Sequence, residues 1–254
     1  LCGAGGMGGG MVCGGGGGRG LGGWRNQLGV WGGGSYKFGP LAVIVDNIIE
    51  DVLGYSPKNA HESAYRYYSE TFLTNRLAER KRERRGFVLA GRKHGVETGL
   101  FYSNAWMLGE IAKELEDIEN DNAIAILFRD TDGASNATRE LWINKHTSIC
   151  EGFKRADFHR GIPMVPRPKS EAWLLCAIKK QPYQHCTVLE DLPGNDRSPK
   201  AVKGQLAKAL NNNATADHLL DWLENNRLKT DKLAAQMPSF LAFHQRMREA
   251  LDML

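Results

Sequence analysis

The sequence predicts an α/β protein in which a parallel sheet is flanked by helices and followed by a helical C-terminal extension. Residues 123–128 form an unbroken apolar run, which is typical of a parallel strand covered on both faces. Residues 162–165 predict a second strand, and a helix is expected after each strand, from about Ala137 and from Ser170 to about Lys179. This alternation of strands and helices is typical of a parallel sheet.

The rest of the chain is expected to be mostly helical. Ser198 followed by Pro199 predicts a helix start, because serine caps helix N-termini and proline suits the first helical position. A short strand is expected at residues 87–90. The other expected helices lie at residues 41–52 (before a turn at Gly54), at 61–85, around Leu108, Ile111, Leu115 and Ile118, around 219–223 and at 240–254.

The first 39 residues differ in composition from the rest, since they hold 19 of the 30 glycines and the first acidic residue is Asp46. A core cannot be built from such a glycine run, yet residues 11–13 (MVC) resemble a strand fragment. A glycine pattern of the dinucleotide-binding type is present, but no acid follows at the distance that binds a ribose. The expected domains are an α/β domain at 1–180, with an unreliable glycine-rich part at 1–34 and a largely helical insertion at 55–120, and a helical region at 181–254.

The net charge of +4 is spread unevenly along the chain. Residues 46–254 carry 30 basic and 29 acidic side chains, which excludes a uniformly basic nucleic-acid binder. One dense basic stretch is the candidate track for a nucleic-acid backbone, although a solvated helix face or a docking surface for an acidic partner explains it equally well. Its members are Arg76, Arg80, Lys81, Arg82, Arg84, Arg85, Arg92 and Lys93.

Neither a membrane span nor a secretory signal is indicated by the sequence. The five cysteines form no CxxC pair and are odd in number, so reduced thiols in a cytoplasmic protein are expected. They are Cys2, Cys13, Cys150, Cys176 and Cys186. P-loop ATPases, HExxH zinc enzymes and hydrolases with a GxSxG elbow are excluded, because their motifs are missing from the sequence.

Asp130 and Asp132 follow the apolar strand directly, at the end where open parallel sheets bind ligands. On an extended chain the two side chains point to the same side, about 6–7 Å apart at the backbone. Carboxylates this close repel each other unless a cation lies between them, and their oxygens suit Mg²⁺ or Mn²⁺. A simple turn at the strand end is the competing interpretation.

Glu171 and two lysines are the other candidate site residues. Glu171 follows the second strand and faces the same sheet edge, although a first-turn acid favoured by the helix dipole is the simpler explanation. Lys200 and Lys203 are expected in the first turn of the helix capped by Ser198, where they would favour phosphate. Solvated lysines on an exposed helix face are the alternative.

The apolar strand ending in DTDG, the later strand leading into PKSEAWLL and the SPK segment together resemble the Toprim fold. The similarity is closer to nucleases of the overcoming-lysogenisation-defect (OLD) type, and it covers roughly residues 123–205. Small stand-alone proteins of this kind occur in bacterial anti-phage systems beside an ABC-type ATPase. The resemblance therefore implies a cytoplasmic, metal-dependent nuclease that contacts nucleic acid and a partner ATPase, with a homo-oligomer also possible.

The resemblance implies roles for individual residues. Asp130, Asp132 and Glu171 match the acids that hold Mg²⁺ or Mn²⁺, and Lys200, with Lys203 as second choice, matches the lysine of the site. The family also has a first-strand glutamate, which should stand at Gly15. Two explanations compete: either the chain is an inactive Toprim module, or the glycine run does not represent the natural side chains. We favour the second, which an intact-mass measurement would test.

Overall fold

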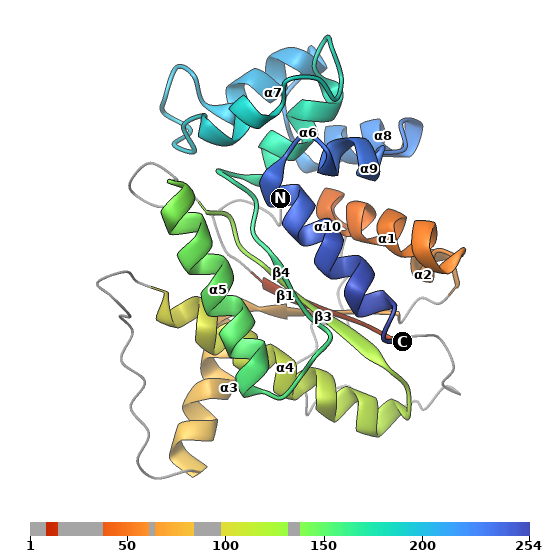
Figure 1. Ribbon diagram of the computed structural model, residues 1–254, viewed down its shortest axis with the longest axis vertical. Helices are drawn as coiled ribbons and strands as arrows, with labels where there is room; N and C mark the ends of the chain where they lie inside the picture. Colours follow the sequence, from red (N-terminus) through yellow and green to blue (C-terminus); the bar gives the residue numbers. More distant parts are fainter. Residues whose placement is uncertain (1–8, 15–37, 61–63, 84–97, 132–137) are drawn as a thin grey trace.

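The computed structural model describes residues 9–14, 38–60, 64–83, 98–131 and 138–254 (Figure 1). These residues form one four-stranded sheet in the order β2-β1-β3-β4, with helices on both faces. The strands are β1 (Gly9–Gly14), β2 (Tyr65–Ser69), β3 (Ala123–Phe128) and β4 (Gly161–Met164). The class of the fold is therefore α/β.

The sheet is mixed and not wholly parallel. β3 and β4 are parallel, as predicted, with Ala125 opposite Gly161 and Phe128 opposite Met164. β1 lies between β3 and β2 and is antiparallel to both, so the prediction of a parallel sheet is wrong for these two strands. The strand fragment predicted at residues 11–13 is confirmed as part of β1.

The helix predicted at residues 61–85 is wrong in its first part. Residues 65–69 (YRYYS) form the edge strand β2, and α3 (Glu70–Glu83) begins directly after it. Aromatic residues favour strands, and here pairing with β1 prevails over the helical spacing of the tyrosines. Leu73 and Leu77 still face the core from α3, as the helical spacing predicts. The strand predicted at residues 87–90 lies outside the described residues.

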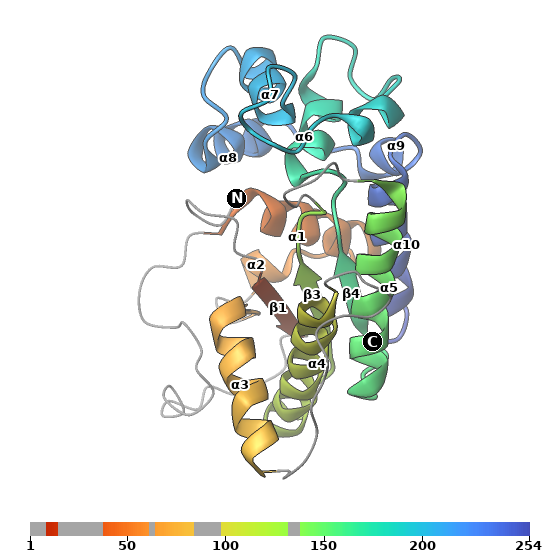
Figure 2. The same ribbon diagram turned by 90° about the vertical axis from the view of Figure 1, so that its left-hand side faces the viewer.

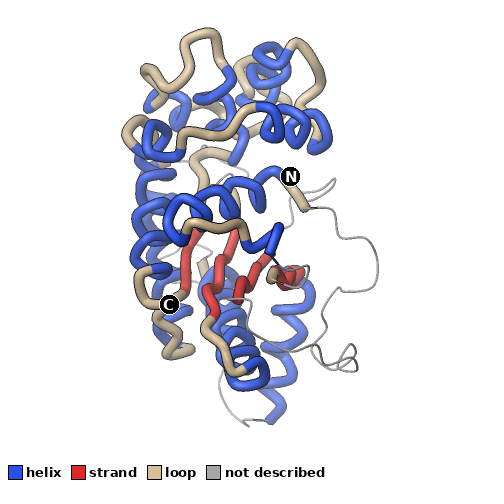
Figure 3. Tube along the Cα trace, turned by 90° about the vertical axis from the view of Figure 1, so that its right-hand side faces the viewer, coloured by secondary structure: helices blue, strands red, loops and turns tan. Residues whose placement is uncertain are grey.

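The other helices agree with the expected pattern, except that α7 begins later than predicted, and α9 and two short elements are found in addition. Figure 3 shows helices on both sides of the strands. The predicted turn at Gly54 is confirmed, with a φ of 78° that suits glycine. The elements are α1 (Pro40–Leu53), α2 (Pro57–Ala60), α4 (Gly99–Glu119), α5 (Arg139–Arg155), α6 (Ser170–Ile178), the 3₁₀ helix η1 (Thr187–Asp191), α7 (Val202–Leu210), α8 (Ala216–Asn225), α9 (Thr230–Ala234) and α10 (Pro238–Leu251).

Successive residues of β3 face two different cores, because side chains alternate along a strand. Ile124 and Ile126 belong to a core built with α1, α6 and α10. Ala123, Ala125 and Leu127 belong to a second core built with α4 and α5. Figure 2 shows α1 and α10 apart from α3 and α4, with the strands between them. The burial of β3 on both faces is thus confirmed.

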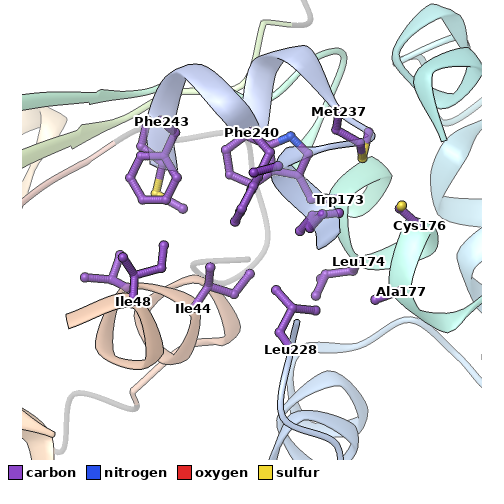
Figure 4. Close-up of a cluster of buried hydrophobic side chains, with 14 of the residues drawn as sticks. Ile44, Ile48, Trp173, Leu174, Cys176, Ala177, Leu228, Met237, Phe240 and Phe243 are labelled. Atoms are coloured by element: carbon purple, nitrogen blue, oxygen red, sulfur yellow. The ribbon is translucent and has the colours of Figure 1, made fainter. Parts of the chain in front are cut away.

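The C-terminal helices share the first of these cores. Trp173 of α6 packs against Phe240 and Phe243 of α10, with ring centroids 4.9 and 5.7 Å away (Figure 4). Its indole Nε1 donates a hydrogen bond of 2.8 Å to the Ser239 hydroxyl. Ile44 and Ile48 of α1 close the same cluster from the other side. The domain boundary expected at residue 181 stays a prediction.

α4 and α5 approach closely at Gly152. A Cβ atom at that position would lie 2.3 Å from the Tyr102 carbonyl oxygen and 2.7 Å from the Ala105 Cβ. Any side chain there would therefore force the two helices apart. By contrast, a Cβ atom on Gly204 of α7 would meet no atom within 4 Å.

Two of the cysteines are joined. Cys176 at the end of α6 forms a disulfide with Cys186, ten residues later and just before η1. The prediction of reduced thiols is therefore wrong for this pair, while Cys150 is a free, exposed cysteine. Within the described ranges, no helix is both long and apolar enough to cross a membrane.

Candidate metal centre

Asp130 lies at the carboxyl edge of the two parallel strands and contacts Ser170, the residue before Glu171. Asp130 follows β3 and Glu171 stands in the first turn of α6, after β4. The backbone N–H of Ser170 donates to Asp130 Oδ1 at 3.0 Å, and the Ser170 hydroxyl lies 3.4 Å from Glu171 Oε2. Glu171 and Ser170 are buried, with exposed fractions of 3% and 2%. Two of the three predicted acids thus contact the same residue, and Asp132 lies outside the described residues.

The backbone on both sides of Asp130 is bonded to the segment that follows β4. The Arg129 N–H donates to the Met164 carbonyl oxygen at 3.1 Å, and the Thr131 N–H donates to the Pro166 carbonyl oxygen at 3.0 Å. The Thr131 hydroxyl donates to the same Pro166 oxygen at 2.6 Å. The parallel pairing of β3 and β4 therefore continues past the ends of the strands, and this holds the Asp130 backbone in place.

Lys145 of α5 is a buried cation beside this segment that the sequence analysis missed. Its ammonium group donates to the Thr131 carbonyl oxygen at 2.6 Å and lies 4.9 Å from the centre of the Phe101 ring. A signal for it was present: Trp142, Lys145 and Ile149 are spaced as one helix face, and the two apolar members predict that this face is turned inward.

Arg129 is a second cation close to the candidate site. Its guanidinium group lies 4.9 Å from the centre of the same Phe101 ring and forms an ion pair with Glu70 of α3. Because the pair is well shielded from solvent, Glu70 offsets much of the arginine charge. Lys145 and Arg129 thus surround Phe101 next to the Asp130 segment.

The segment between β4 and α6 is held by the C-terminal region. Arg167 forms an ion pair with Asp191 and lies 3.7 Å from Glu190, which is 2% exposed. Glu190 Oε1 accepts a hydrogen bond of 2.7 Å from the Ser239 N–H at the start of α10. Burial raises the pKa of Glu190, and the bonds from Ser239 and the charge of Arg167 oppose that rise. The segment leading to Glu171 is therefore fixed by contacts far along the chain.

Lys200 and Lys203 are both exposed, and the prediction about their helix is wrong in part. α7 begins at Val202, not after Ser198, so Lys200 precedes the helix and Lys203 alone lies in its first turn. The Ser198 hydroxyl accepts a bond of 3.3 Å from the Lys200 N–H, which forms a local turn in place of a helix cap. α7 packs against α6 through Val202 and Leu206.

The described part of the basic stretch is partly paired with acids. Arg76 and Arg80 of α3 form ion pairs with Glu114 and Glu110 of α4, the second at 3.0 Å. Arg82 is exposed. These pairs reduce the positive charge that α3 offers to a polyanion. The remaining predicted contacts, Arg84, Arg85, Arg92 and Lys93, lie outside the described residues.

The direction of β1 bears on the first-strand acid that the resemblance implies. Gly14 pairs with Ala123 at the start of β3, whereas Gly9 pairs with Phe128 at its end. β1 therefore ends at the edge of the sheet opposite Asp130. Gly15 itself lies outside the described residues. The expectation that a carboxylate after β1 would join Asp130 is not supported by this strand direction.

The described donors suit a hard cation in chemistry but are few in number. Asp130 and Glu171 offer carboxylate oxygens, which Mg²⁺ and Mn²⁺ prefer, and they contact one common residue. Among the described residues, no three His, Cys, Asp or Glu side chains form a group that could hold a metal ion. Asp132, two residues after Asp130, would have to supply the third carboxylate. Comparisons of the chain with protein-family models, curated proteins and solved structures gave no match.

Proposed function

We propose that the chain is a Mg²⁺- or Mn²⁺-dependent nuclease of Toprim-like type that hydrolyses a phosphodiester bond of DNA or RNA. The observation that carries the proposal is that Asp130 accepts the N–H of Ser170, the neighbour of the buried Glu171, beyond the ends of two parallel strands. Ligands of open α/β sheets bind at this edge, and a buried carboxylate such as Glu171 is costly unless a positive charge compensates it.

Asp130, Asp132 and Glu171 are the residues proposed to hold the metal. A divalent ion bound there supplies Lewis-acid stabilisation of phosphate oxygens and a lowered pKa for a bound water. The Ser170 N–H and the paired segments around Thr131 orient the acidic side chains. Lys200, exposed beside α7, is proposed to neutralise charge on the phosphate, with Lys203 next to it.

The partners follow from the same proposal. The exposed bases Arg82 and Lys203, together with Arg84, Arg85, Arg92 and Lys93, are proposed to contact the nucleic-acid backbone. Arg80 would contribute only by exchanging its ion pair with Glu110. We further propose a cytoplasmic location and an ABC-type ATPase as the partner subunit of an anti-phage complex, with self-association as a further possibility for its assembly.

The experiment is a cleavage assay on supercoiled DNA and on structured RNA with Mg²⁺, Mn²⁺ or a chelator. Glu171→Gln is expected to lower metal-dependent cleavage by more than about 100-fold, because even residues that only orient metal ligands cost about 10–100-fold in affinity or activity. Glu224→Gln on α8, which changes an exposed glutamate in the same way, serves as the control. Cleavage that survives Glu171→Gln or the chelator would contradict the proposal.

A second candidate function is a non-catalytic Toprim-like module that binds a partner ATPase or nucleic acid. The antiparallel direction of β1 favours it, because β1 ends at the sheet edge opposite Asp130. This candidate predicts that the chain has no cleavage activity with either metal, alone or with its partner, and that Glu171→Gln leaves partner binding unchanged.

A further inference from the structure

The segment around α7 carries positive charge that no acid within it balances. Residues 197–216, all of which the structure describes, include four basic side chains and no acidic one. All four are exposed, and they are Arg197, Lys200, Lys203 and Lys208. Because residues 46–254 as a whole carry 30 basic and 29 acidic side chains, this segment departs strongly from the rest of the chain. It therefore produces a local positive potential.

α7 presents the centre of this charge on an open helix face. Val202 and Leu206 are buried, whereas Lys203, Gly204 and Lys208 are exposed. A Cβ atom on Gly204 would meet no other atom within 4 Å, so packing within the described chain does not explain the glycine. Glycine weakens a helix relative to alanine, but it allows a bound molecule to approach the helix backbone closely.

The exposed side chains of this segment suit a phosphate backbone better than a protein surface. Interfaces between proteins centre on aromatic and apolar side chains and are poor in lysine. Within residues 197–216 of the described chain, no large apolar side chain is exposed. Apart from Pro199, the exposed side chains are instead those of lysine, arginine, asparagine and threonine, which contact phosphate and sugar in nucleic-acid complexes. The exposed asparagines and threonine are Asn211, Asn212, Asn213 and Thr215.

The same segment begins beside the candidate site. Asp196, the residue before Arg197, forms an ion pair with Lys169 at 3.0 Å. The next residue after Lys169 is Ser170, which donates its N–H to Asp130. By contrast, α3 lies at the opposite end of the molecule from α7 in Figures 1 and 2, and two of its arginines pair with acids of α4. The positive charge of the α7 segment is thus less compensated than that of α3, and it begins near the sheet edge that carries Asp130.

We propose that the exposed face of α7, with Arg197 and Lys200 before it, binds the phosphate backbone of DNA or RNA, and that Gly204 allows this backbone to approach the helix. The inference rests on the proposed function, in which the substrate is a nucleic acid, and it names the surface that holds that substrate. Each lysine that contacts a phosphate releases about one bound counterion, so the affinity depends on the salt concentration. The binding is independent of base sequence, because phosphates carry no sequence information directly.

The first test compares two double variants that lower the net charge equally. Lys203→Gln with Lys208→Gln removes two charges from α7, and Lys154→Gln with Lys232→Gln removes two exposed lysines from α5 and α9. Binding of the full chain to fluorescent duplex DNA and RNA is measured by anisotropy, with a chelator present to prevent metal-dependent cleavage.

The α7 double variant is expected to bind duplex DNA roughly 10-fold less tightly for each lysine at 0.1 M salt, with a slope of log affinity against log salt that is smaller by about 2. The control double variant is expected to bind nearly as tightly as the wild type. Equal effects of the two double variants, or wild-type affinity in the α7 variant, would overturn the inference.

Gly204→Leu tests the same surface without changing its charge. Leucine favours a helix and meets open space at this position, so the variant is expected to be at least as stable as the wild type in urea unfolding. Its side chain would hold a nucleic acid away from the helix backbone, and several-fold weaker binding is expected. Wild-type affinity in Gly204→Leu would overturn the placement of the nucleic acid on this face.

Cleavage assays on the same proteins separate this inference from the proposed function. If the wild-type chain binds nucleic acid through α7 but shows no cleavage with Mg²⁺ or Mn²⁺, the inference stands and the proposed function fails. If the chain cleaves and the α7 double variant binds as tightly as the wild type, the inference alone fails. Polyglutamate serves as the probe for an acidic protein partner, and a chain that binds polyglutamate but neither nucleic acid would overturn the inference in favour of such a partner.

Discussion

Replacing Asp130 is expected to separate its role in metal binding from a role in stability. α6 begins at Ser170, and the N-cap residue Lys169, whose ammonium group pairs with Asp196, has no side-chain acceptor for the free N–H groups of the helix. Asp130 Oδ1, from the neighbouring strand end, accepts the Ser170 N–H at 3.0 Å and so acts as the cap. Asp130 therefore has two tasks that different substitutions affect differently.

The magnitudes follow from this hydrogen bond. Asp130→Ala leaves the Ser170 N–H without its acceptor, which costs about 1–3 kcal/mol for a buried donor. Asp130→Asn keeps an acceptor oxygen at the same position and loses only the attraction of a charge to the helix dipole, about 0.3–1 kcal/mol. The asparagine variant should therefore stay within about 1 kcal/mol of the wild type.

Urea unfolding and Mn²⁺ calorimetry on both variants measure the two tasks. Both variants should lose Mn²⁺ binding, and Asp130→Ala alone should lose substantial stability. Matched substitutions of Asp117, an exposed aspartate on α4, should change neither quantity. Wild-type stability in Asp130→Ala would refute the capping role, and Mn²⁺ binding retained by Asp130→Asn would refute the ligand role.

Two further predictions concern packing and pH. Gly152→Ala should destabilise the chain by about 1–3 kcal/mol in urea unfolding, because the new Cβ atom would clash with the backbone of α4. Gly204→Ala, in open space on α7, should instead stabilise it by about 0.5–1 kcal/mol, and equal effects would contradict the packing argument. Burial disfavours the charged form of Glu190 and so raises the pKa of its carboxyl group. The stability that the protonated Glu190 contributes is therefore fully present below the ordinary carboxyl pKa and is lost as the pH rises through the raised value. Glu190→Gln should therefore gain stability relative to the wild type as the pH rises above the ordinary carboxyl pKa, and a gain that shrinks with rising pH would refute the assignment.

Elements with a strong local pattern could be predicted from the sequence. α1 has an apolar face, a proline at its start and a glycine at its end, and each of these signals comes from neighbouring residues. β3 was found because its burial on both faces demands an uninterrupted apolar run. The start of α7 was misplaced because the Ser198 hydroxyl accepts the Lys200 N–H in a turn. A serine hydroxyl caps a helix by the same kind of bond to a nearby backbone N–H, so the sequence does not distinguish the two cases.

Features that depend on distant contacts could not be predicted. Glycine has no side chain to reveal which face or neighbour a strand prefers, so the direction of β1 could not be predicted. The Cys176–Cys186 pair has no characteristic spacing, and it forms because η1 returns to the end of α6. The contact of Asp130 with Ser170, beside Glu171, was predictable, since the ends of adjacent parallel strands share an edge, whereas Lys145 required the helix face of α5 to be considered.

The shared core of α1, α6 and α10 has a consequence for biosynthesis. The face of β3 and β4 that carries Ile126 and Ile162 is covered by residues such as Met247 and Leu251, which are synthesised about 70 residues after α6. At about 5–20 residues per second, the ribosome needs roughly 4–15 s to supply them. During that time the part of this apolar face that α10 covers stays exposed on the nascent chain, while α1 and α6 are already available to cover the rest.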